Sequence, residues 1–170
     1  MADFSGKLGD YEVSAFDLIS HNGHIEDLKD KLVSFQLYED MYSPSLSAKI
    51  SILDTQGLIN YVPIIGQETV NISFITARGQ TPINLNMTVT KVTGLESESA
   101  TQTFNIETVT SDMVKNFETR ISQSFSGSAT EIAQQCFSKG GFSKLLEIEP
   151  SDDRYEQESA LVIPNMTPFK

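Results

Sequence analysis

The sequence is 170 residues long and carries 12 basic against 23 acidic side chains, a net charge of −11 at pH 7. This balance excludes a nucleic-acid-binding surface, because phosphate binding depends on clustered Lys and Arg, and the sequence has no such cluster. Its one cysteine, Cys136, excludes an intrachain disulfide and a Cys-based metal site and is typical of folding in a reducing compartment. The longest uncharged apolar stretch, Leu58–Ile65, is much shorter than the roughly 20 residues that a membrane span needs.

Alternating side chains predict a paired antiparallel unit early in the chain. Apolar and polar residues alternate over Val33–Tyr38, and the same period of two returns over Ala48–Leu53. The turn-rich joint between them, Glu39–Pro44, is longer than a two-residue hairpin loop. We expect the two runs to form a long hairpin that reaches toward a neighbouring subunit.

The same alternation predicts a larger sheet further along the chain. One helical turn is expected at Leu58–Tyr61, and a polar connection is expected at Gly94–Ala100. Polar and β-branched residues on the second face of each run fit a sheet with one face in water. The three further strands are expected at Val70–Phe74, Ile83–Thr90 and Phe104–Val109.

The pattern becomes helical after residue 110. Ser111–Asn116 has the composition of a short capped helix or turn. Ser128 and Glu131 have the spacing of a capping box, and apolar residues then fall on one helical face until Gly140 stops the run. This predicts an amphipathic helix over 128–139, which we expect to plug one open end or one side of the sheet.

The last part of the chain predicts the start of a second domain. Glu149–Arg154 is acidic, contains a proline and has the composition of a linker, and Leu161–Pro164 is a last apolar run. Asn165–Lys170 is expected to begin a helix that has no body, which indicates a domain cut short. The expected organisation is a mainly β domain over 1–150, an antiparallel barrel or sandwich with the helix packed on it, followed by a linker and truncated second domain over 151–170.

The residues that could carry chemistry form no convincing site. His21 and His24 lie in a Gly-containing loop with no third metal ligand, so a solvated loop is the better interpretation. Cys136 falls on the apolar face of the expected helix, away from the helix start that would activate a thiol. Five carboxylates could in principle pair as in glycosidases, but most of them fall in connections or on polar faces: Asp54, Glu68, Glu96, Glu98 and Glu107. We therefore expect no catalytic, cofactor or metal site.

The order of structural residues resembles a known family. Phe35–Ile59 resembles baseplate hub proteins of contractile-tailed bacteriophages, the central hub of T-even-like phages in particular: an extended strand, an aromatic–Ser–Pro turn, a returning strand that ends in Asp, and a Gly-Leu-Ile start to a short helix. The segment Pro63–Phe74 is similar to the step that follows in that family, as are Arg120–Phe125 and Ile163–Phe169. The resemblance covers Tyr11–Lys170 and rests on the order of the motifs.

The resemblance implies a structural virion protein with a tail-tube-like β-barrel and no enzymatic activity. It implies a homotrimer that presents a pseudo-sixfold ring in the phage tail baseplate, assembled in the host cytoplasm. The tail tube protein docks on one side and the spike protein on the other, other baseplate proteins bind around the ring, and DNA passes through the lumen without specific binding; no membrane is involved. The residues fit this in two respects, because long strands need their edges paired and an acidic surface does not hold DNA.

Two other interpretations stay open. The same fold would serve a hub-spike component of a type VI secretion or tailocin apparatus. A non-viral β-sandwich that binds a glycan or peptide is the alternative from another class, and it would need an aromatic patch among the loops at one end.

Overall fold

The computed structural model describes residues 11–76, 79, 81–98, 101–142 and 157–169. The chain divides into two compact units, Met1–Ser111 and Asp112–Lys170. This division lies well before the domain boundary expected near residue 150. The apolar run at 145–148 and the linker expected at Glu149–Arg154 fall outside the described residues.

The first unit is built on one antiparallel sheet, so the mainly β fold class is confirmed. In the described residues the sheet has seven strands in the order β2-β1-β5-β6-β7-β4-β3. Two short helices complete the unit, α1 (Leu58–Tyr61) and the 3-10 turn η1 (Lys29–Lys31). The strands are β1 (Tyr11–Ile19), β2 (Ile25–Asp27), β3 (Leu32–Tyr38), β4 (Ser47–Asp54), β5 (Thr69–Thr76), β6 (Ile83–Glu98) and β7 (Thr101–Thr110).

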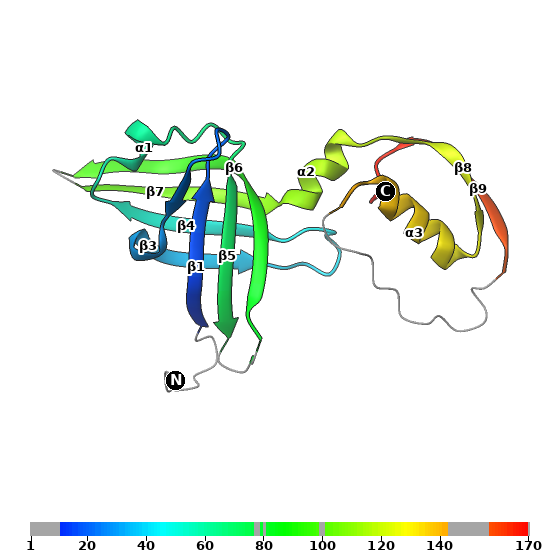
Figure 1. Ribbon diagram of the computed structural model, residues 1–170, viewed down its shortest axis with the longest axis horizontal. Coiled ribbons are helices and arrows are strands. Elements are labelled where there is room, and N and C mark those ends of the chain that lie inside the picture. Colours follow the sequence, from blue (N-terminus) through cyan, green and yellow to red (C-terminus); the bar gives the residue numbers. More distant parts are fainter. Residues whose placement is uncertain (1–10, 77–78, 80, 99–100, 143–156, 170) are drawn as a thin grey trace. The chain divides into compact units, whose positions relative to one another are not determined.

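The sheet curls into a half-barrel because the long strand β6 belongs to both of its halves. The first part of β6 pairs with β5 up to Thr88, and after a bulge between Val89 and Lys91 the strand continues along β7. In Figure 1, β1 and β5 run across the direction of β4 and β7. The curl brings Phe35 of β3 into edge contact with Phe74 of β5, with ring centroids 5.6 Å apart.

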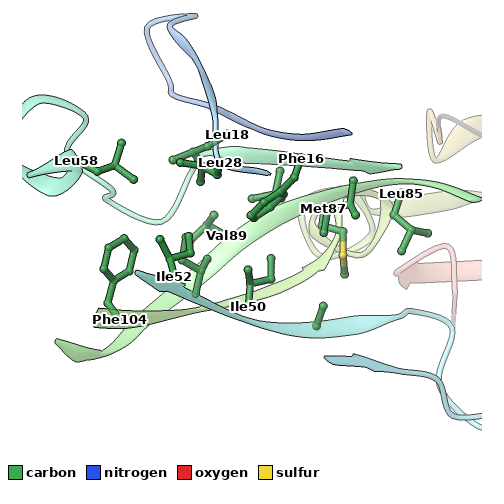
Figure 2. Close-up of a cluster of buried hydrophobic side chains, with 14 of the residues drawn as sticks. Phe16, Leu18, Leu28, Ile50, Ile52, Leu58, Leu85, Met87, Val89 and Phe104 are labelled. Atoms are coloured by element: carbon green, nitrogen blue, oxygen red, sulfur yellow. The ribbon is translucent and has the colours of Figure 1, made fainter. Parts of the chain in front are cut away.

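The concave side of the curled sheet holds the core (Figure 2). Alternate residues of each strand point inward, as a period of two requires. Each side chain that becomes fully buried here contributes about 1.5–3 kcal/mol of transfer free energy. The most completely buried strand residues are Phe16, Leu18, Ile50, Ile52, Met87, Val89, Phe104 and Ile106.

The segment that covers one end of this core is α1. Leu58 and Val62 of the α1 segment are buried in the core cluster, as is Leu28 just before η1. The helix expected at 128–139 is present as α3 (Ala129–Lys139), but it belongs to the second unit and packs on β8 (Ile121–Gly127). A helical pattern predicts an apolar face and leaves open which surface covers it.

The second unit contains α2 (Ser111–Glu118), β8, α3 and β9 (Ser159–Met166). The predicted capping box is confirmed: the Ser128 side chain accepts from the backbone N–H of Glu131, and the Glu131 side chain accepts from the backbone N–H of Ser128. β8 and β9 form a two-stranded sheet, and Ile121 and Phe125 pack with Ile132 of α3 in a small separate core.

Two expectations about strand ends differ from the structure. The polar connection at Gly94–Ala100 is largely strand, because β6 extends to Glu98 and a bulge around Gly94 (φ 65°) keeps it paired with β7. Of the helix start expected at Asn165–Lys170, Asn165 and Met166 belong to β9, Pro168 and Phe169 form a turn, and Lys170 lies outside the described residues. Pro164 is accommodated at a bulge in β9, where Asn165 takes a positive φ of 51°.

Candidate assembly surface

The predicted hairpin is confirmed, and it leaves one strand edge open. β3 and β4 pair antiparallel from Leu32↔Ile52 to Tyr38↔Ser47. β4 also pairs with β7, so it lies inside the sheet and does not project as an arm. β3 is the last strand of the sheet, and in the described part of the chain it pairs with β4 alone. Its second row of backbone N–H and C=O groups is therefore available to another strand.

The composition of β3 does not protect this edge. Its seven residues, Leu-Val-Ser-Phe-Gln-Leu-Tyr, contain no charge and no proline. Val33 was expected on the inner face, but the register shift between Leu32 and Ser34 turns it outward and leaves it 60% exposed. Tyr38 at the other end is 52% exposed. β3 is thus an uncharged edge with apolar side chains at both ends.

Other edge strands in the protein carry features that discourage pairing with a further strand. β2, the opposite edge of the sheet, has three residues and two of them, Glu26 and Asp27, are acidic. β9 carries Pro164 and a bulge. Natural edges are commonly blunted in these ways, and β3 carries none of these features.

The outer half of β6 offers a second open edge. From Lys91 to Glu98 the strand pairs with β7 only, within the residues that the structure describes. Leu95 in this stretch is exposed. The alternation of apolar and polar residues did not predict this edge, because the bulge at Gly94 separates the apolar residues Val92 and Leu95 by three positions and so breaks the period of two. A segment without that period has the pattern of a loop.

The loop between β3 and β4 presents two large side chains to solvent. Met41 is 87% exposed and Tyr42 is 88% exposed. The loop is ordered by its own polar groups: the Asp40 carboxylate accepts from the Tyr42 N–H at 2.9 Å, and the Asp40 carbonyl accepts from the Ser43 N–H at 3.0 Å. These side chains are held away from the core beside the end of β3.

Two of the candidate carboxylates are buried structural groups. Asp54 and Glu68 are each fully buried. Glu68 accepts from the N–H groups of Ile65, Gly66 and Gln67 at 2.8, 2.9 and 3.1 Å. Asp54 accepts from the N–H groups of Gln56 and Leu58. Both organise the connection between β4 and β5.

The other candidate carboxylates do not converge on a site. Glu96 is exposed on β6, and Glu107 is partly buried on β7, opposite Lys91. Glu98 is at the end of β6. Among the described residues no group of three or more His, Cys, Asp and Glu side chains is placed to hold a metal ion.

The histidines and the cysteine lie in separate places. His21 and His24 are exposed in the turn between β1 and β2, where the Asn22 side chain accepts from the His24 N–H at 3.1 Å. Cys136 is partly buried against the small core of the second unit, and this burial raises the pKa of its thiol. In the part of the chain that is described, no helix is long and apolar enough to cross a membrane.

Comparisons with known proteins give weak similarity only. No family model matches the chain, and no curated protein matches it. Two matching solved structures are of the Francisella PdpA–VgrG complex, one lidded and one half-lidded, at 12% sequence identity and TM-scores of 0.42 and 0.41. The matches cover 92% and 96% of this chain but 24% and 28% of those chains, so this chain spans about a quarter of their length. Neither is a structure of a T-even phage hub, and that finer resemblance stays a prediction.

Proposed function

We propose that this chain is a structural subunit of a hub ring in a contractile tail or a related injection apparatus, and that copies join through the open edge of β3. The observation that carries the proposal is the edge itself: seven uncharged residues whose outer backbone groups pair with no other strand among the described residues, beside two exposed side chains, Met41 and Tyr42. An edge of this kind is completed by strand addition, which extends the sheet from one chain into the next.

The receiving edge is the outer half of β6, Lys91–Glu98. Its eight residues match the seven of β3 in length. Because the two edges are different surfaces, their contact is head-to-tail, and such contacts close into a ring when the rotation between copies allows it. A trimer in the tail baseplate of a virion, with its tube and spike partners, is the specific form of this proposal. A type VI secretion or tailocin hub would use the same contact.

The charge of the chain fits a ring around a conduit. With 23 acidic against 12 basic residues, its surface repels phosphate, so DNA would pass through a lumen without adhering. The role needs no catalysis, and we propose that the protein is not an enzyme.

The experiment is a measurement of oligomeric mass by multi-angle light scattering for the chain and two matched variants. Val33→Lys places a charge on the β3 edge, at a side chain that is 60% exposed. Ile25→Lys places the same charge on the short edge strand β2, at a side chain that is 61% exposed. Both variants should keep the far-ultraviolet circular dichroism of the unmodified chain, because neither side chain is part of the core.

We expect the chain and Ile25→Lys to form oligomers and Val33→Lys to be monomeric. A monomeric unmodified chain at the highest concentration that stays in solution refutes assembly. Equal oligomers of all three proteins show that another surface joins the copies and refute the assignment to β3.

A further inference from the structure

A strap crosses one end of the core between two glycines in the left-handed region. The strap, defined here as Gly57–Gly66, contains α1 and connects β4 to β5. Gly57 has a φ of 76° and Gly66 a φ of 96°, which other residues adopt only with strain. Both ends of the strap therefore have backbone positions suited to a change of direction.

The strap is organised by bonds at its own two ends. At the first end, the buried Asp54 carboxylate accepts from the N–H groups of Gln56 and Leu58. At the second end, the buried Glu68 carboxylate accepts from three consecutive N–H groups, those of residues 65–67. The Glu68 bonds lie within the connection, whereas the Asp54 bonds tie the start of the strap to the last residue of β4.

Two kinds of contact hold the strap against the rest of the unit. Leu58 and Val62 are buried in the core beside Leu28, and Figure 2 shows Leu58 directed toward the side chains of the sheet. The Tyr61 hydroxyl donates to Glu26 Oε1 at 3.0 Å. This bond ties α1 to β2, in addition to the bond from the Leu58 N–H to the Asp54 carboxylate at the end of β4.

Glu26 is the centre of this polar contact and links three elements. Lys31 of η1 donates to the same Oε1 at 2.8 Å, and His24 Nε2 lies 3.6 Å from Oε2. The Lys31 bond lowers the pKa of the Glu26 carboxyl against the opposing effect of burial, and the Tyr61 bond adds to it. The carboxylate therefore stays ionised as a strong acceptor for Tyr61.

We propose that the strap opens as a unit about Gly57 and Gly66, and that the contact between Tyr61 and Glu26 is the latch that keeps it closed. Opening exposes the buried faces of Leu28, Leu58 and Val62 while β4 and β5 keep their ladders, because each is paired with a strand on both sides. The device thus controls access to this end of the core, and it is independent of strand pairing at β3.

Amide hydrogen exchange on the full chain tests the proposal, with Tyr61→Phe as the latch variant. Tyr38→Phe is the matched control, since Tyr38 is 52% exposed against 50% for Tyr61 and its hydroxyl donates to Gln36 at 2.6 Å. The reporters are the strap amides of Leu58 and Ile65, whose bonds to the Asp54 and Glu68 carboxylates span Gly57 and Gly66 and break when the strap opens. The reference is the set of amides in β4 and β7.

We expect the strap amides to exchange faster than the reference amides in the unmodified chain. Tyr61→Phe should accelerate strap exchange by about threefold to tenfold, the effect of losing one ordinary hydrogen bond on a local opening, and leave the reference set unchanged. Tyr38→Phe should leave the strap unchanged. If Tyr61→Phe changes strap and reference amides equally, or changes neither, there is no separate latch-controlled opening and the proposal is overturned.

Discussion

Replacement of Glu68 measures what a buried carboxylate contributes to this fold. Its Oε1 accepts from the Ile65 N–H, and its Oε2 accepts from the N–H groups of Gly66 and Gln67. Glu68→Gln preserves the volume but keeps one acceptor oxygen. That oxygen can accept from the N–H groups of Gly66 and Gln67. The NH2 group of the new side chain then faces the N–H of Ile65, which is left without an acceptor.

The magnitude follows from the number of donors left without a partner. An unsatisfied buried donor costs about 1–3 kcal/mol, so Glu68→Gln, with one such donor, should lower the free energy of unfolding by about 2 kcal/mol. Glu68→Ala removes the acceptor for all three donors, and because water reaches part of this turn the loss should be about 3–4 kcal/mol rather than three full penalties.

The assay is urea unfolding followed by tyrosine fluorescence. Four of the five tyrosines precede Asp112, so the signal reports mainly on the first unit. With a denaturant slope of about 2 kcal/mol per molar, Glu68→Gln should lower the urea midpoint by ~1 M. Glu12→Gln, at an exposed position of β1, is the control and should change stability by less than about 0.5 kcal/mol. A midpoint for Glu68→Gln equal to that of the control would show that the carboxylate does not organise the turn.

Two further predictions concern other polar groups. The Lys31 bond lowers the folded-state pKa of Glu26 below its usual value of 4.5, so the stability from this carboxylate is present above pH 4.5 and is lost as the pH falls through the lower folded value. Glu26→Gln should therefore make the urea midpoint less dependent on pH in this acidic range. An unchanged pH dependence would contradict the assignment. In the second unit, Ser128→Ala removes one half of the capping box and should lower the stability of α3 by about 1 kcal/mol. Hydrogen exchange of the first-turn amides of α3 measures this loss. The control, Ser122→Ala on the exposed face of β8, should leave the exchange of these amides unchanged.

Local patterns predicted the elements whose formation depends on neighbouring residues. The hairpin of β3 and β4, the single turn of α1, the start of β5 and the capping box of α3 all follow from periodicity or from cap residues close in the chain. The strands β1 and β9 were missed. β1 has a bulge between Val13 and Ala15, and β9 has one at Pro164, so neither keeps a period of two.

The sequence by itself determined that this is a mainly β, acidic chain with one amphipathic helix and a β3–β4 hairpin, because alternation, composition and capping are properties of adjacent residues. Only the tertiary structure decided that α1 covers the core, that α3 packs in a separate unit, that Asp54 and Glu68 are buried, and that β3 ends the sheet. Each of these depends on which surfaces distant segments bury together, and the energy of burial is the same for any apolar partner of suitable shape.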